Sequence, residues 1–65
     1  MLQLMILRKN RRLSQKELGR RIGVSNVKIS RFENGQEIPR ADVLKKLAIE
    51  LDTTMDILME EFGRN

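Results

Sequence analysis

The chain has 65 residues, of which 40% are hydrophobic and 34% charged, so it is long enough for one small domain with a marginal core. It contains neither cysteine nor histidine, which excludes disulfides, thiolate or imidazole metal sites and histidine-based catalysis. The net charge of +4 is uneven, with ten Lys/Arg against three Asp/Glu in residues 1–40 and three against six in residues 41–65. We expect no metal, no cofactor and no enzymatic activity.

The basic first part of the chain predicts a polyanionic partner, because one-sided charge of this kind is typical of nucleic-acid binding. Lysines placed for solubility alone would explain a mixed surface better than a polarised one. The apolar start, "MLQLMIL", lacks the preceding positive charge of a secretory signal and is too short to span a membrane. We therefore expect a cytoplasmic protein without membrane association.

Apolar residues at helical spacing predict a first helix over roughly residues 2–12. Basic residues crowd its C-terminal end, where cations interact favourably with the helix dipole. Four apolar residues of the terminus form an ambiguous set, because they are either part of a frayed end or an oligomer contact. The apolar set is Leu4, Ile6, Leu7 and Leu13, the basic set is Arg8, Lys9, Arg11 and Arg12, and the ambiguous set is Met1, Leu2, Met5 and Ile6.

The segment "SQKE", residues 14–17, predicts a second helix that begins with a capping box. In this motif Ser14 accepts from the backbone N–H of Glu17, and the Glu17 carboxylate reaches back to the backbone of Ser14. Gly19 leaves room for a close helix contact, and Gly23 ends the helix in a left-handed conformation. The residues expected to face inward are Leu18 and Ile22.

A third helix is predicted to begin after Ser25, which is a second N-cap, and to run to about Glu33. A fourth follows Pro39, and Thr54 can cap a fifth after a break at residues 52–53. The inward residues are Val24, Ile29 and Phe32 for the turn and third helix, Val43, Leu44, Leu47, Ala48 and Leu51 for the fourth, and Met55, Leu58, Met59 and Phe62 for the fifth. The sequence therefore predicts a compact all-α five-helix bundle, a single domain over residues 1–65.

The second and third helices, joined by a tight glycine turn, form a predicted helix-turn-helix, whose second helix can lie in the major groove of DNA. Its exposed stripe carries side chains suited to base edges: Arg or Lys for guanine, Asn for adenine and Val for the thymine methyl. Gln15, at the start of the second helix, is placed to meet a phosphate beside free backbone N–H groups. The stripe comprises Asn26, Val27, Lys28, Ser30 and Arg31.

The text "LRKNRRLSQKELGRRIGVSNVKISRFENG", followed by "IPRADVLKKLAIELDTTMDILM", resembles the Cro and phage-repressor helix-turn-helix family, also called the xenobiotic-response-element family. The resemblance covers about residues 4–59 and implies the lambda-repressor-like fold, with helices 2 and 3 as the helix-turn-helix. It implies sequence-specific binding of double-stranded DNA by a nucleoid-associated regulator of bacterial or phage origin. It also implies base reading by Asn26, Val27, Lys28 and Arg31, phosphate contacts by Gln15, Ser25, Ser30, Asn34 and Arg40, and a structural ion pair between Arg8 and Glu33.

The resemblance and symmetry together imply a homodimeric repressor on a near-palindromic operator, with half-sites about one helical turn (~34 Å) apart. The fifth helix is the expected interface, while the apolar N-terminus and parts of the protein outside these residues are alternatives. The competing interpretation is a helix-turn-helix protein-interaction module, or the antitoxin component of a toxin–antitoxin pair. No small-molecule ligand is indicated. The predicted interface residues are Ile57, Met59, Glu61 and Phe62.

Overall fold

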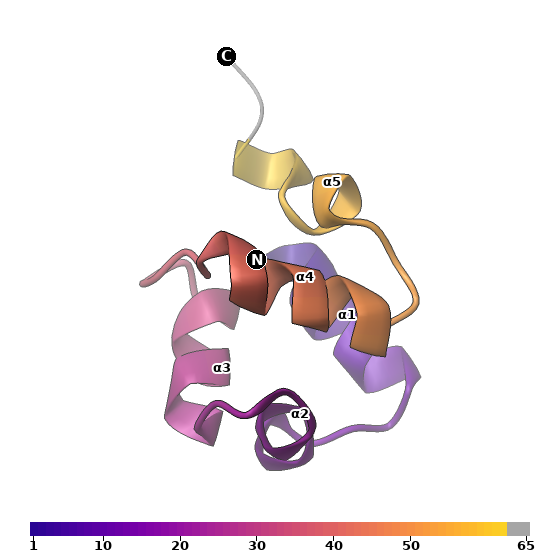
Figure 1. Cartoon of the computed structure of the whole chain (residues 1–65), viewed down its shortest axis with the longest axis vertical. Helices are drawn as coiled ribbons and strands as arrows, with labels where there is room; N and C mark the ends of the chain where they lie inside the picture. The colour runs from indigo at the N-terminus through magenta and orange to yellow at the C-terminus, as the bar shows by residue number, and fades with distance from the viewer. Residues whose placement is uncertain (63–65) are drawn as a thin grey trace.

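A computed structural model describes residues 1–62, and within that range the secondary structure is entirely helical (Figure 1). Its elements are α1 (Leu2–Asn10), α2 (Gln15–Ile22), α3 (Asn26–Glu33), α4 (Ala41–Glu50), α5 (Met55–Leu58) and a 3₁₀ turn, η1 (Glu60–Phe62). The predicted all-α fold with five short helices is confirmed. Residues 63–65 of the predicted single domain lie outside the described residues.

The core is formed by apolar side chains from all five α-helices, and it fixes which face of α3 is free. In Figure 1, α2 and α3 lie at one end of the molecule and α5 at the other, with α1 and α4 between them. Burial of each large apolar side chain contributes about 1.5–3 kcal/mol. The buried residues are Met1, Leu4, Leu18, Ile22, Ile29, Phe32, Leu44, Leu47, Ala48, Leu51 and Leu58.

The first helix is shorter than predicted, because it ends at Asn10 rather than at residue 12. Arg12 has a left-handed backbone with a φ of 57°. Its backbone N–H donates to the carbonyl oxygen of Lys9, and the backbone N–H of Leu13 donates to that of Arg8. This is the Schellman arrangement, whose left-handed position usually holds glycine. Asp52, with a φ of 52°, ends α4 in the same way. Because the left-handed residue after α1 is an arginine and not a glycine, the end of this helix is hard to recognise in the sequence.

Serine side chains cap the two helices of the helix-turn-helix as predicted. Ser14 Oγ accepts from the backbone N–H of Glu17 at 2.9 Å, and Ser25 Oγ accepts from that of Lys28 at 3.1 Å. The reciprocal half of the predicted capping box is wrong, because the Glu17 carboxylate instead accepts from the guanidinium groups of Arg20 and Arg21.

Gly19 is the point of closest approach between α2 and the turn that leads to α3. A Cβ atom at this position would lie 2.5 Å from the carbonyl oxygen of Val24 and 3.2 Å from the carbonyl carbon of Ser25. Any larger residue would push the backbone of the turn away, so the prediction that a close contact leaves no room for a side chain is confirmed. The two helices are thereby held at a fixed separation, with Gly23 in the left-handed turn position (φ 81°).

The fifth helix is also shorter than predicted and is continued by η1. Thr54 caps it, with Oγ1 accepting from the backbone N–H of Ile57 at 3.1 Å. Leu58 is buried and Met59 packs partly against the core, but Met55 and Phe62 are 37% and 40% exposed. The prediction that these last two residues face inward is wrong, because a four-residue helix makes only one turn and cannot extend one apolar stripe from residue 55 to 62.

The N-terminus is packed into the fold rather than frayed. Met1 is 2% exposed, and its amino group donates to the carbonyl oxygens of Phe32 and Glu33, both at 3.0 Å. These carbonyls belong to the last turn of α3, where intrahelical donors are lacking. The Glu61 carboxylate accepts from the backbone N–H of Leu2 at 2.6 Å and lies 3.3 Å from the amino group. A frayed end is therefore the wrong interpretation for Met1.

Candidate nucleic-acid interface

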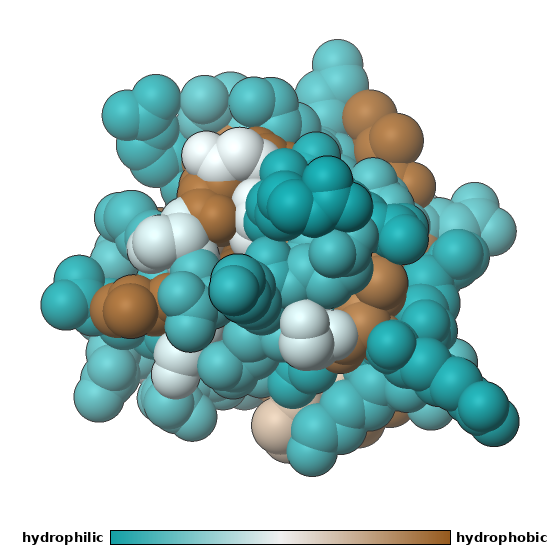
Figure 2. All heavy atoms as spheres, turned by 90° about the horizontal axis from the view of Figure 1, so that it is seen from below, coloured by the Kyte–Doolittle hydropathy of each residue, from teal (hydrophilic) through white to brown (hydrophobic). Residues whose placement is uncertain are grey.

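The third helix has one apolar face in the core and one polar face in solvent. Ile29 and Phe32 are buried, whereas Asn26, Val27 and Arg31 are exposed. Within residues 1–62, the side chains of Asn26 and Arg31 take part in no ion pair or side-chain hydrogen bond. Seen from the α2 side of the molecule, the surface is mostly hydrophilic with small separate apolar patches (Figure 2). Three residues of the predicted stripe, Asn26, Val27 and Arg31, are thus presented outward by a helix that is anchored from behind, while Lys28 and Ser30 are partly buried.

The predicted structural pair, Arg8 and Glu33, lies behind this helix and is almost fully buried. Arg8 Nε lies 2.6 Å from Glu33 Oε2, and Arg8 Nη2 donates to Glu33 Oε1 at 3.1 Å. The exposed fractions of the two side chains are only 9% and 2%. Arg8 Nη1 also donates to the carbonyl oxygen of Leu13 at 2.7 Å. Such a two-point contact, with further hydrogen bonds, is the geometry that a buried ion pair requires.

Gln15, a predicted phosphate contact, belongs to the same network. Its Nε2 donates to Glu33 Oε1 at 3.0 Å, so one N–H of the amide is used inside the protein. An amide side chain has a second N–H and a carbonyl oxygen. Gln15 therefore joins the buried ion pair to the N-terminal end of α2.

The other predicted phosphate contacts are distributed around the ends of α3 and the start of α4. Ser25 caps α3, and Asn34 Nδ2 donates to Ser30 Oγ at 3.4 Å at the opposite end of that helix. Arg40 precedes α4 and lies 3.3 Å from Asp42, an ion pair that lowers the pKa of the Asp42 carboxyl group. Arg40 therefore carries a partly compensated charge before any partner binds.

Lys28, a predicted base-reading residue, is bound to a carboxylate of its own chain. Its Nζ donates to Glu37 Oε2, and both side chains are only partly exposed, at 45% and 31%. The two residues line a hollow of about 180 Å³ between α3 and the segment that leads to α4. Val24, Phe32, Arg40 and Val43 complete its lining.

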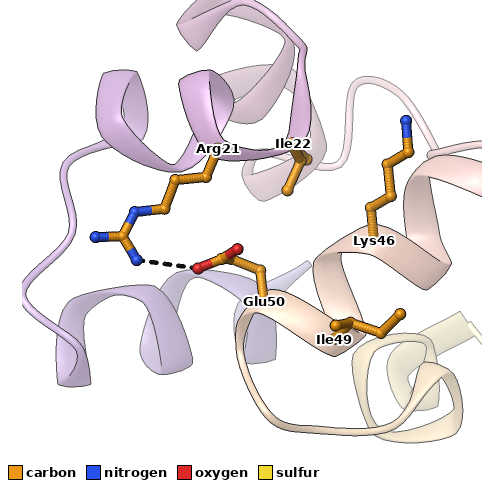
Figure 3. A pocket seen from close by; sticks show the side chains of 5 residues that line it. All are labelled: Arg21, Ile22, Lys46, Ile49 and Glu50. Carbon is orange, nitrogen blue, oxygen red and sulfur yellow. Dashed lines mark hydrogen bonds and ion pairs between the residues drawn. The ribbon is translucent and has the colours of Figure 1, made fainter.

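One ion pair, between Arg21 and Glu50, fastens α2 to α4 (Figure 3). Arg21 Nη1 lies 3.0 Å from Glu50 Oε2, beside a surface hollow of about 290 Å³ that Ile22, Lys46 and Ile49 also line. On α2 itself, hydrogen bonds from Arg20 and then Arg21 lower the pKa of Glu17 to about 2. These exposed pairs make the surface of α2 less positive than its arginines alone would suggest.

Sequence reasoning missed the internal contacts of several predicted functional residues, among them Gln15–Glu33 and Arg40–Asp42. Two others are Lys28–Glu37 and Glu61–Leu2. The first joins residues nine positions apart on either side of a turn, and the second joins the two ends of the described chain. A weak signal for the first was present, since Glu37 is the only acidic residue between Glu33 and Arg40 in a strongly basic region. The second has no periodic signal at all.

The comparison with known families gives the class of protein. A family model described as Helix-turn-helix matches residues 4–58, which is most of the chain, and the chain belongs to this family. The family is that of the Cro- and C1-type, or xenobiotic-response-element, regulators, so the resemblance drawn from the sequence is confirmed. Membership supports a DNA-binding transcription regulator in general, in a family that is typically non-enzymatic.

No curated protein and no solved structure is significantly similar to the chain. Among residues 1–62, no helix has both the length and the apolar character needed to cross a bilayer.

Proposed function

We propose that the protein binds double-stranded DNA sequence-specifically, with α3 in the major groove, and acts as a homodimeric repressor on a near-palindromic operator. The observation that carries this proposal is the polar face of α3, which is exposed while the opposite face is fixed in the core. A helix held in this way can enter the groove without first being ordered. Family membership supports the same partner.

The side chains on this face differ in what they can recognise. Arg31 is suited to the O6 and N7 atoms of guanine, Asn26 to adenine and Val27 to the methyl group of thymine. Val27 is 53% exposed, so its methyl groups are available for contact with a thymine methyl group. The predicted phosphate contacts, Gln15, Ser25, Ser30, Asn34 and Arg40, would set the register of the helix.

Selection of bound duplexes from a random pool tests base reading, and Arg31→Ala is the informative variant. We expect the wild type to enrich a sequence and the variant to lose preference at one base position, with affinity for the wild-type site falling by about 1–3 kcal/mol. Arg11→Ala removes the same charge near Asp52, away from α3, and should leave the preference unchanged. Uniform weakening on all sequences would instead make Arg31 a phosphate contact.

The proposed homodimer uses the exposed apolar residues of the α5–η1 region. Ile57 and Phe62 are 41% and 40% exposed, and Met59 is partly buried. The carboxylate of Glu61, also a predicted interface residue, already accepts a hydrogen bond from the backbone N–H of Leu2. At the interface, Glu61 would therefore present a carboxylate whose position is fixed by its own chain. For the proposed operator, a symmetric pair of these surfaces has to hold the two copies of α3 about one helical turn of DNA (~34 Å) apart.

Sedimentation velocity over a wide range of protein concentration tests this interface. We expect a dimer for the wild type and a monomer for Ile57→Glu, because a buried, unpaired carboxylate would prevent the apolar contact. Ile49→Glu is the matched control, since Ile49 is 70% exposed but lies on α4. A wild type that remains monomeric at the highest concentration would exclude the α5–η1 interface.

A further inference from the structure

The contact between Lys28 and Glu37 places a carboxylate beside a residue of the proposed reading face. Lys28 lies in the first turn of α3, and Glu37 lies after the helix, in the segment that precedes Pro39. We propose that Glu37 is a positioning residue that determines specificity, because it makes Lys28 a donor for base edges rather than a charge for phosphates. This inference rests on the proposed DNA-binding function and deepens it.

The position of Glu37 is fixed by the backbone, not only by its side chain. The backbone N–H groups of Gln36 and Glu37 donate to the carbonyl oxygen of Arg31, at 2.9 and 3.3 Å. Gly35 permits this return with a left-handed backbone, at a φ of 75°. The chain therefore folds back along α3, and the carboxylate is held next to Lys28 before DNA is present.

The effect on DNA recognition follows from the difference between a phosphate and a base edge. Attraction to a phosphate depends mainly on net charge, and because Lys28 and Glu37 are in contact, their charges largely cancel at distances greater than their separation. A guanine O6 or N7 is a neutral acceptor, for which the N–H donor matters more than the net charge. A lysine ammonium has three N–H donors, so bonding to Glu37 leaves two for a base.

A neighbouring pair extends this pattern around the same hollow. Arg40, which lines it together with Lys28 and Glu37, is paired with Asp42. Two of the cations nearest the reading face are thus compensated by carboxylates, whereas Arg31 is unpaired within residues 1–62. Sequence-independent attraction to the DNA backbone is weakened where it would compete with base reading.

The test compares Glu37→Gln with wild type on two duplexes, one selected from a random pool and one of random sequence, over a series of salt concentrations. For the variant we expect affinity for the random duplex to rise by at least about threefold, because Lys28 gains a free charge. Affinity for the selected duplex should rise by less than about twofold, so that the specificity ratio falls. The dependence of log K on log salt for random DNA should steepen by about one per subunit.

Two further variants separate this role from simpler ones. Asp52→Asn makes the same change in net charge after α4, outside both α3 and the proposed dimer interface, and it likewise frees a paired cation, Arg11, so it measures the general effect of charge. Asparagine also tolerates the left-handed backbone of this position. In a Lys28→Met background, Glu37→Gln should affect random-duplex affinity no more than Asp52→Asn does. Thermal unfolding of each variant shows whether the fold is kept.

The results that would overturn the inference differ in whether DNA binding itself still stands. If wild type binds both duplexes and Glu37→Gln leaves the ratio and the salt slope unchanged, or raises the ratio, the role of Glu37 is wrong while DNA binding stands. If Glu37→Gln weakens binding to both duplexes equally, the residue is only structural and the inference is overturned. If wild type binds no duplex, the proposed function fails and the inference fails with it.

Discussion

Replacing Arg8 with methionine is expected to lower the free energy of unfolding by about 3–5 kcal/mol. The substitution leaves the Glu33 carboxylate, 2% exposed, with Gln15 as its remaining side-chain donor. A buried charge without its partner keeps the full penalty of desolvation, and Leu13 also loses a donor to its carbonyl oxygen. Since small domains are stable by only about 5–15 kcal/mol, a large part of the variant should be unfolded at modest urea concentration. Circular dichroism during urea unfolding measures the change.

Two comparison variants show whether the loss comes from the unpaired charge. Arg11→Met removes an arginine from an exposed pair with Asp52, 3.8 Å apart, and should lower stability by less than about 1 kcal/mol. The double variant Arg8→Met, Glu33→Met removes both charges and should recover much of the loss, because an apolar pair needs no compensation. An Arg8→Met protein as stable as Arg11→Met would show that the pair does not hold α1 to α3.

DNA affinity is expected to fall by about 10³–10⁵-fold between about 50 and 200 mM salt, if the homodimer neutralises about six to ten phosphates. Each cation that replaces a condensed counterion contributes to the slope, and residues 1–40 supply the positive charge for this exchange. Fluorescence anisotropy with a labelled duplex measures the constant at each salt concentration. The Lys28–Glu37 and Arg40–Asp42 pairs should keep the slope below what a count of arginines and lysines alone would suggest.

The matching control is urea unfolding of the protein over the same salt range, which shows that the fold is present throughout. A flat response, or no binding to any duplex in a random pool, would contradict DNA binding by this face. It would then favour the protein-interaction or antitoxin interpretation for the same helices.

Local signals predicted the parts of the fold that depend on neighbouring residues. The serine and threonine caps at Ser14, Ser25 and Thr54 were predictable because each bonds an N–H only three residues away. Gly23 was predictable because a left-handed turn favours glycine. The exposed polar face of α3 followed from the same local reasoning, since helical spacing alone separates Ile29 and Phe32 from the other residues of the helix.

Contacts between residues far apart in the sequence were harder to predict. The ion pair of Arg8 with Glu33 came from resemblance to a family, because nothing local links residues 25 positions apart. The end of α1 was misplaced because Arg12 adopts a backbone that arginine rarely takes. The partner of Lys28 was missed because the turn at Gly35 brings back a carboxylate, and surface charges carry no periodic pattern.

The close contact at Gly19 has a consequence for the thermodynamics of association. Because the carbonyl group of Val24 fills the space where a side chain would lie, α2 and α3 meet a partner as one preformed unit. Little backbone entropy is then lost on docking, and the loss that remains belongs to the rotamers of long side chains such as Arg31. In the proposed complex with DNA, α3 would enter the groove at an angle fixed by this contact. A mismatched base pair would then cost a hydrogen bond, because the helix could not move to compensate for it.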